Sequence, residues 1–377
     1  MSKKNILQLI KYYKGNAPLL NSMVKPDSEE LSTVVCYLGG SDDGLNQMEN
    51  VAAKTVYCNI PKRKINWTRS KTLKRLVQII DQNHIDLVVC QFRRTIPIGV
   101  IAAGLSTRKP KVIAVLHGIV GGKVGWGRKL VNYFVFKRLA KIVSVSEYGI
   151  EDIVRLNLGL ARENIVAIQN GLVCQPFLSK STRTRSELFP SLPDNAFIFA
   201  MVGRLAPVKN HVRVLHAFRK VIDREAQAYL LMAGTGPLET QLKTIVEEEG
   251  LQRNVIFLGF RRDVPDILHN IDAYLMPSLR EGLPMALMEA MVCGLPVITS
   301  ETTGMRELIP DETLGYLLNP NSIESIANTM LDVIASKEGE RCARGQRARA
   351  RILENFTATA MANRYENLYR EILALNS

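Results

Sequence analysis

The sequence predicts two α/β domains, each built on an open parallel sheet with helices on both faces. First, short apolar segments rich in β-branched residues alternate with segments that are apolar at helical spacing, which is typical of repeated strand–helix units. Second, this periodicity is lost at residues 176–193, where Ser, Thr, Arg and Pro accumulate before the alternation resumes. Third, 377 residues are enough for two domains. We therefore expect domains at 1–175 and 194–356, a linker at 176–193, and a last helix within 357–377.

The first half contributes the first of these sheets. Strands are expected at residues 5–10, 33–38, 55–58, 86–91, 111–116, 141–145 and 165–168. Helices are expected at residues 69–82, 96–105, 128–139 and 147–157. Ligands of such sheets bind at the carboxyl ends of the strands. The first such loop contains Gly15 and Asn16, both tolerant of unusual backbone conformations. The loop after 111–116 begins with His117, which on general grounds is as often structural as functional.

The second half repeats the alternation. Strands are expected at residues 197–202, 228–233, 254–258, 272–276, 296–299 and 314–318. Three helical segments follow residue 322, and the last, at 357–373, is amphipathic. The second half is thus a second Rossmann-like domain.

The loop after residues 197–202 reads G-R-L-A-P-V-K-N. Lys209 is expected to begin a helix that runs to about residue 224, where the helix dipole favours negative rather than positive charge. A cation at this place is understandable if an anion such as a diphosphate lies between the helix amides, Lys209 and Arg204. Chance placement of a surface lysine is the alternative.

The loop after residues 228–233 reads G-T-G-P-L and opens a helix. A dinucleotide fingerprint beginning at Gly234 would need a third small residue at position 239, which is Glu239, so binding of NAD is excluded. The next strand ends in L-G-F-R, with Arg261 in the loop.

Residues 272–300 read as strand, loop, helix and second buried strand. They carry two carboxylates. Glu281 lies in the loop, where no structural need for it is evident. Glu289 lies inside the helix, and its neighbours at three and four residues are apolar, so its carboxylate should lose water and require a bonding partner. An ion pair with a basic side chain elsewhere is the structural alternative.

The stretch P-S-L-R-E-G-L-P-M-A-L-M-E-A-M-V-C-G-L-P-V-I closely resembles the donor-binding signature of the retaining glycosyltransferases of family four. The resemblance implies the GT-B fold, in which two Rossmann-like domains face each other across a cleft and the C-terminal helix crosses back to the first domain. It implies that Glu281 faces the donor sugar and that Glu289 holds the ribose of the nucleotide. The backbone that meets the sugar and the diphosphate is implied to be that of Gly282, Leu283, Pro284 and Met285.

Sequence motifs in the other loops resemble motifs of the same family. The G-R-x-x-x-x-K pattern implies that Arg204 and Lys209 neutralise the departing diphosphate, and the G-x-G-P-L pattern places Gly234 at the donor. The loop of Arg261 is implied to lie near the base, and His117 is implied to hydrogen-bond the donor sugar. Gly15 and Asn16 stand where the family usually has two adjacent glycines beside the diphosphate and the acceptor.

Composition narrows the cellular setting. No apolar run reaches the roughly 18 residues that a bilayer span needs, and the chain leads into a strand without a secretory signal, so we expect a cytoplasmic protein. The six cysteines are scattered without a C-x-x-C pair, which favours reduced thiols over disulfides or zinc.

Charge is distributed unevenly. Residues 1–180 contain 27 Lys and Arg against 12 Asp and Glu, whereas the remainder contains 22 against 24. Both tryptophans, Trp67 and Trp126, lie among the basic residues, a combination suited to an anionic membrane surface. A merely solvated basic face is the alternative. Nucleic-acid binding is a third option with weaker support, because no reader motif is present and aromatic content is low, so no nucleic-acid partner is expected.

Taken with these residues, the resemblance implies a transferase that moves a sugar from a nucleotide-diphosphate donor to a hydroxyl of a glycan or lipid-linked acceptor, with retained anomeric configuration. Surface polysaccharide or lipopolysaccharide biosynthesis is the expected setting. The chain lacks a D-x-D triplet, so no metal or other cofactor is expected. The resemblance implies that the leaving phosphate, rather than Glu281 as a nucleophile, takes part in the transfer step. The alternatives are a sugar-nucleotide epimerase, an inactive membrane-surface adaptor, and an inverting transferase with His117 as general base.

Overall fold

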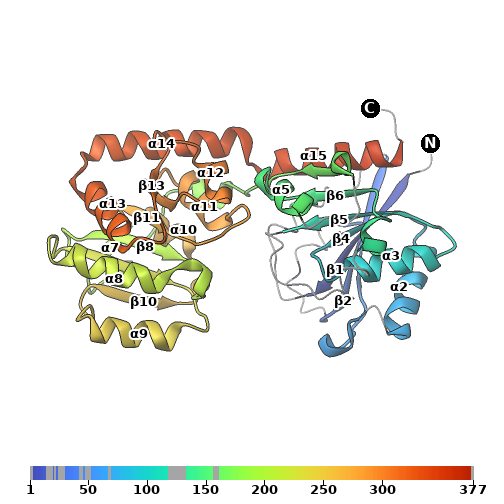
Figure 1. Ribbon diagram of the computed structural model, residues 1–377, viewed down its shortest axis with the longest axis horizontal. Coiled ribbons are helices and arrows are strands. Elements are labelled where there is room, and N and C mark those ends of the chain that lie inside the picture. The colour runs from blue at the N-terminus through green and yellow to red at the C-terminus, as the bar shows by residue number, and fades with distance from the viewer. Residues whose placement is uncertain are drawn as a thin grey trace. The chain divides into compact units, whose positions relative to one another are not determined.

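The computed structural model in Figure 1 describes residues 3–13, 20, 23, 30–41, 46, 52–66, 69–117, 133–155 and 161–374, apart from the side chain at position 303. The chain divides into two compact units. Unit 1 comprises Met1–Val173 together with Ala358–Ser377, and unit 2 comprises Cys174–Thr357. The segment expected as a linker, 176–193, therefore falls inside unit 2.

The described part of unit 1 is organised around a parallel sheet with strand order β3-β2-β1-β4-β5-β6-β7. Its strands are β1 (Lys4–Tyr12), β2 (Leu31–Gly39), β3 (Lys54–Tyr57), β4 (Ile85–Gln91), β5 (Lys111–Leu116), β6 (Lys141–Ser144) and β7 (Ile165–Ala167). Its helices are η2 (Lys62–Lys64), α2 (Ser70–Gln82), α3 (Ile96–Leu105), α5 (Tyr148–Arg155), η3 (Arg162–Asn164) and α15 (Ala358–Leu373). The helix expected at 128–139 begins outside the described residues.

The central strands of unit 1 are apolar on both faces, as expected for a parallel sheet covered on both sides. One face packs against α2 and α3 through side chains such as Leu76 and Ile98. The other face packs against α15 through Met361, Tyr365 and Tyr369. Helix α15 is distant in sequence from these strands, yet its apolar face completes the core of the first sheet (Figure 1). This packing explains the amphipathic pattern of the last helix.

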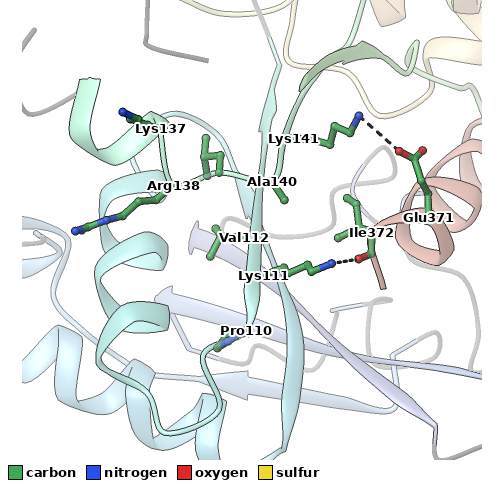
Figure 2. A pocket seen from close by; sticks show the side chains of 10 residues that line it. Pro110, Lys111, Val112, Lys137, Arg138, Ala140, Lys141, Glu371 and Ile372 are labelled. Carbon is green, nitrogen blue, oxygen red and sulfur yellow. Dashed lines mark hydrogen bonds and ion pairs between the residues drawn. The ribbon is translucent and has the colours of Figure 1, made fainter. Parts of the chain in front are cut away.

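Polar contacts also tie the end of α15 to the amino ends of β5 and β6. Figure 2 shows the Lys111 ammonium donating to the backbone carbonyl of Ile372 and Lys141 paired with Glu371 at 3.5 Å. The pocket drawn there is also lined by Lys137 and Arg138. It lies at the amino ends of the strands, the edge opposite to the one at which open parallel sheets bind their ligands.

The described part of unit 2 has a second parallel sheet, with strand order β10-β9-β8-β11-β12-β13. Its strands are β8 (Phe197–Val202), β9 (Ala228–Ala233), β10 (Val255–Gly259), β11 (Ala273–Met276), β12 (Val297–Ser300) and β13 (Tyr316–Leu318). Its helices are α6 (Gln175–Leu178), α7 (Arg185–Leu188), η4 (Pro207–Lys209), α8 (His211–Ile222), α9 (Glu239–Glu248), α10 (Val264–His269), α11 (Met285–Val292), α12 (Thr303–Leu308), α13 (Ile323–Ala335) and α14 (Glu338–Asn355).

One local expectation, the start of α8, needs correction. Helix α8 begins at His211, so the prediction that Lys209 begins this helix is wrong; Lys209 ends the short turn η4, and Asn210 between them is left-handed with φ of 65°. In the segment 176–193, α7 carries a capping box at Thr184, and the Arg185 guanidinium donates to Asp272 at 2.9 Å. That contact attaches the segment to β11.

Candidate donor-binding site

Two glycine loops meet at the carboxyl ends of β8 and β9. Gly203 and Gly234 have φ of 150° and 141°, and a Cβ on Gly234 would lie 1.9 Å from the Gly203 carbonyl oxygen. A Cβ on Gly236 would lie 2.3 Å from the carbonyl oxygen of Leu205, which itself accepts from the Leu238 amide. Gly234 and Gly236 are therefore required by close backbone contact, whereas Gly203 is favoured by its positive φ. All three leave bare backbone at the strand ends, where phosphates can approach amide groups.

Lys209 and Glu281 form an ion pair at this edge, with Lys209 Nζ 2.8 Å from Glu281 Oε1. Both side chains are mostly buried, with 19% and 18% of their surfaces exposed. The expectation that nothing structural requires Glu281 is therefore wrong, because its carboxylate neutralises a half-buried ammonium. The Glu281 Oε1 atom makes no hydrogen bond of normal geometry, so it retains capacity to accept one.

Asn210 brings the two partners of this pair together. Its buried amide donates to the carbonyls of Pro277 at 3.1 Å and Pro320 at 2.7 Å, which attaches the start of α8 to the loop after β11. The Leu279 amide donates to the Val208 carbonyl at 2.8 Å and holds the same two loops together. A left-handed residue between η4 and α8 therefore directs Lys209 towards Glu281.

Glu289 lies in α11 beside buried apolar side chains. Among the described residues no Lys or Arg forms an ion pair with it, and burial raises its pKa to about 7. The buried hydroxyl of Tyr274 donates to the Val202 carbonyl, and burial followed by the charges of Glu289 and Glu281 holds its pKa well above the usual value. The charges of Glu281 and Glu289 therefore both raise the pKa of Tyr274. Of these two carboxylates, only Glu281 has a charged partner among the described residues.

The remaining predicted residues of unit 2 differ in the contacts they make. Arg204 is exposed, and in the part of unit 2 that the structure describes it forms no ion pair. The Arg261 guanidinium is held by Asp263, which raises the pKa of Arg261 through a hydrogen bond and charge attraction. Gly282 to Pro284 precede α11, which begins at Met285, so the amides of its first turn lack intrahelical partners.

Of the predicted site residues in the first half, only His117 lies among the described residues. Gly15 and Asn16 lie outside the described residues. His117 follows β5, and its Nε2 atom lies 2.6 Å from Gln91 Oε1. Its Nδ1 atom is buried without a hydrogen-bond partner among the described residues, and burial lowers the pKa of the ring to about 4. His117 is therefore neutral at physiological pH.

Sequence reasoning missed three features of unit 2. Asn210 positions Lys209, as described above. Gly304 at the start of α12 supports the Glu281 loop, because a Cβ there would lie 2.1 Å from the Gly282 carbonyl oxygen. Phe260, after β10, has 71% of its surface exposed, which is unusual for a large aromatic side chain. The available signal was that each lies in the connection that follows a strand of the parallel sheet.

Neither a membrane span nor a clustered metal site is found in the described residues. No described helix is long and apolar enough to cross a bilayer. The described residues also contain no group of three His, Cys, Asp or Glu side chains placed to hold a metal ion. A small cavity lies at the ends of β8 and β11, where Lys209, Tyr274 and buried His211 line it. His211 is buried, and this burial lowers the pKa of its ring to about 4.

Comparison with known proteins identifies both halves of the chain. Residues 184–351 match the family model of glycosyl transferases group 1, and residues 32–175 match that of glycosyltransferase family 4. A similar curated protein is the Escherichia coli UDP-Gal:alpha-D-GlcNAc-diphosphoundecaprenol alpha-1,3-galactosyltransferase, 27% identical over 312 residues that cover 80% of each chain. The Escherichia coli O-antigen biosynthesis glycosyltransferase WclY is 27% identical over 274 residues, which cover 70% of this chain and 73% of WclY.

Solved structures show the same fold. Anabaena HepE in complex with UDP and glucose superposes with a TM-score of 0.81 at 19% identity, covering 98% of this chain and 100% of HepE. A glycosyltransferase from Rickettsia africae gives a TM-score of 0.81 at 18% identity over the whole of both chains. With two Rossmann-like units, a family 4 model on the first half and a group 1 model on the second, the chain belongs to the family 4 glycosyltransferases of the GT-B fold.

Proposed function

We propose that the chain transfers a sugar from a nucleotide-diphosphate donor to a hydroxyl of a lipid-linked glycan, with retention of anomeric configuration. The observation that supports this most directly is the Lys209–Glu281 pair beside bare glycine backbone, with Glu289 nearby and without a charged partner. A cation suits the diphosphate, and carboxylates suit the hydroxyls of sugar and ribose.

Each group has a distinct role in this proposal. Lys209 and exposed Arg204 bind the diphosphate and stabilise the charge that develops on it as the glycosidic bond breaks. Glu289 accepts hydrogen bonds from the ribose hydroxyls, which supply a partner for its half-buried carboxylate. Glu281 accepts a hydrogen bond from the sugar through Oε1, which accepts no hydrogen bond of normal geometry from the described residues.

The transfer step is proposed to occur on one face of the sugar. The bond from the anomeric carbon to the leaving diphosphate breaks, the acceptor oxygen forms the new bond on the same face, and the acceptor proton passes to the leaving phosphate. Glu281 is not assigned as a nucleophile, because its carboxylate is already engaged by the Lys209 ammonium at 2.8 Å, which makes it less reactive. We further propose that Lys209 and Arg204 replace a metal ion, in keeping with the absence of a D-x-D triplet from the sequence.

The relatives suggest the substrate class. The name of the Escherichia coli galactosyltransferase describes transfer from UDP-Gal to a diphosphoundecaprenol-linked sugar, and WclY is named for O-antigen biosynthesis. Anabaena HepE was crystallised with UDP and with UDP-glucose. A UDP-sugar donor and a polyprenyl-diphosphate glycan acceptor, in surface polysaccharide or lipopolysaccharide biosynthesis, are therefore the first pair to test.

A donor panel tests the proposal. Thermal stability and nucleotide release are measured with UDP-, GDP-, dTDP- and ADP-sugars, with and without EDTA, and proton NMR of the product reports the anomeric configuration. We expect one donor class to stabilise the protein and EDTA to have no effect. Glu281→Ala and Glu289→Ala should lose most activity while remaining folded, whereas Glu248→Gln on the exposed end of α9 serves as the matched control. Near-normal turnover in either alanine variant, or release of an altered sugar without transfer, would refute the assignment.

We also propose that unit 1 associates with the cytoplasmic face of an anionic membrane. Tyr133 and Phe134 are exposed aromatic residues, with 41% and 59% of their surfaces accessible. The exposed cations Lys137 and Arg138 follow them, and Lys137 Nζ lies 6.0 Å from the centre of the Tyr133 ring. Adjacent aromatic and basic side chains are the pairing that membrane interfaces favour.

Vesicle sedimentation tests this association. The protein should bind vesicles containing anionic phospholipid at low salt, release at high salt and ignore neutral vesicles. Phe134→Ser should weaken binding, whereas Phe260→Ser, an exposed phenylalanine of unit 2, should not. Equal binding to neutral and anionic vesicles would contradict the proposal.

A further inference from the structure

A chain of hydrogen bonds crosses the interior of unit 1 and ends at His117. His117 Nε2 lies 2.6 Å from Gln91 Oε1, and Gln91 Nε2 donates to Gln8 Oε1 at 2.9 Å. Gln8 Nε2 in turn donates to the hydroxyl of Tyr369 at 3.0 Å. Gln91, Gln8 and Tyr369 are buried, with 1%, 2% and 5% of their surfaces exposed. Two buried glutamines in adjacent strands require a reason, since burying an amide without complete bonding is costly.

The strand register explains how these side chains meet. Gln8 of β1 lies opposite Val89 of β4, and Gln91 lies opposite Val115 of β5. Side chains two residues apart point to the same face of a sheet, so Gln8, Gln91 and His117 share the face of Val89 and Val115. That face is the one covered by α15, which carries Tyr369. The hydrogen-bonded chain therefore runs from the last helix across three adjacent strands to the carboxyl edge of the sheet.

The direction of the bonds determines where the His117 proton lies. Because the Gln91 amide group donates to Gln8, its carbonyl oxygen is the atom that faces His117. A carbonyl oxygen only accepts, so Nε2 of His117 carries the hydrogen and Nδ1 carries the lone pair. Nδ1 is the atom that is buried without a partner among the described residues. The ring is therefore prepared to accept a hydrogen bond through Nδ1.

Phe92 holds the same ring from another side. Its ring centre lies 4.3 Å from that of His117, at an angle of 34° between the planes. Phe92 has φ of 70°, a left-handed conformation that a bulky side chain rarely adopts, and its amide donates to the Val115 carbonyl at 3.1 Å. Such a conformation persists where the surroundings require it and is frequent at functional sites. Two successive residues, Gln91 and Phe92, thus determine the position of His117.

We propose that Gln91, Gln8 and Tyr369 are positioning residues that keep His117 in the Nε2–H tautomer, with Nδ1 presented to a hydroxyl of the sugar substrate. This assigns His117 as the hydrogen-bond acceptor of that hydroxyl, with Gln91 as the partner that orients the ring. The inference rests on the proposed function for the identity of the hydroxyl. The tautomer and its dependence on Gln91 are properties of unit 1 and can be measured without any substrate.

Nitrogen NMR of the histidine rings tests the tautomer directly. The chain has only five histidines, so ¹⁵N-histidine labelling gives few signals, and the His117 signal is assigned by its loss in His117→Asn. We expect the wild-type ring to show the Nε2–H pattern at pH 7. Gln91→Leu should give a mixture of tautomers, whereas Gln91→Glu, whose carboxylate still accepts from Nε2–H, should preserve the pattern. An Nδ1–H pattern in the wild type, or an unchanged pattern in Gln91→Leu, would overturn the proposal.

A pair of tyrosine variants tests the far end of the chain in the full-length enzyme. Tyr369→Phe removes the acceptor of Gln8 and should shift the tautomer balance and lower kcat/KM by about 2- to 10-fold. Tyr365→Phe is the matched control, because Tyr365 is also buried on α15 but its hydroxyl has no hydrogen-bond partner among the described residues. Tyr365→Phe should leave both readouts unchanged. Equal effects of the two variants on the tautomer would refute a positioning role for Tyr369.

The two proposals fail in different ways. If no donor sugar is ever transferred but the Nε2–H pattern depends on Gln91, the proposed function fails and the positioning of His117 stands. If transfer occurs but His117 titrates as an ordinary exposed imidazole with mixed tautomers, the positioning fails and the proposed function stands.

Discussion

Replacement of Glu289 by glutamine should stabilise the protein and weaken nucleotide binding at the same time. Burial raises the pKa of Glu289 from its ordinary 4.5 to about 7. In the unfolded chain the carboxyl ionises near 4.5, whereas in the folded chain it holds its proton up to about 7. The folded state therefore binds more protons between these values, and the free energy of unfolding falls as pH rises through this window.

The magnitude follows from the shift. Each pKa unit corresponds to about 1.4 kcal/mol, so a shift from 4.5 to about 7 means that ionised Glu289 destabilises the fold by at most about 3.5 kcal/mol above pH 7. Glutamine has the same shape and no charge. Glu289→Gln should match the wild type below pH 4.5 and exceed it by up to that amount at pH 8. The corresponding rise in Tm is about 2 to 4 °C per kcal/mol for a unit of this size.

The assay can localise the effect to unit 2. Both tryptophans fall within the sequence of unit 1, so tryptophan fluorescence follows that unit while circular dichroism follows both. Urea denaturation at pH 5 and pH 8 should show a pH-dependent gain in the circular dichroism transition that is absent from fluorescence. Glu248→Gln, exposed on α9, should show none.

Glu289→Gln should bind nucleotide more weakly even though it is more stable. A ribose hydroxyl that bonds to ionised Glu289 gains a charge-assisted hydrogen bond, so Glu289→Gln should lose roughly tenfold in affinity for the donor nucleotide at pH 8. If the free energy of unfolding changed with pH in the same way for Glu289→Gln and the wild type, the claim that burial raises the pKa of Glu289 would be refuted. Unchanged nucleotide affinity would refute the ribose contact.

Three further variants test the rest of the site. Lys209→Met should lower kcat by about 10²- to 10³-fold because the leaving diphosphate loses its cation, and full activity would contradict that role. Gly234→Ala should destabilise unit 2 by more than about 1 kcal/mol, measured as the urea midpoint, because its Cβ would overlap the Gly203 carbonyl; Gly339→Ala, with open space around it, is the control. Phe260→Ala should weaken nucleotide binding by about tenfold if its exposed ring stacks on the base, and unchanged calorimetric affinity would exclude stacking.

The regular elements were predictable because their information is local. The alternation of apolar segments gave the bounds of α3, β5, β8 and β9 as the structure has them, since each is a buried run ended by polar or glycine residues. The amphipathic pattern at 357–373 likewise predicted α15. The glycines of the two loops were noticed from sequence as family motifs, whereas their physical reason, the close backbone contacts of Gly234 and Gly236, required coordinates.

The contacts that place the site residues were not predictable in the same way. The left-handed Asn210 that separates η4 from α8 is stabilised by the carbonyls of Pro277 and Pro320, which are 67 and 110 residues away in sequence. The partner of Gln8 on α15 is 361 residues away. A glutamine in a strand gives no sign of its partner, because hydrogen-bond direction depends on register and on the face that the strand presents.

The Lys209–Glu281 pair has a consequence for how a diphosphate can bind. A free lysine loses about 2 kcal/mol of rotamer entropy when it is immobilised, but in unit 2 the ammonium is already held 2.8 Å from a carboxylate and mostly buried. Folding therefore bears the cost of ordering it, and the donor meets a cation in place. The charge of Glu281 also prevents an isolated ammonium from remaining unpaired in a half-buried loop when no donor is bound, which would be costly. Glu281 thus contributes to the ligand-free protein as well as to the proposed sugar contact, and loss of its carboxylate should affect diphosphate binding through Lys209 even where the sugar is absent.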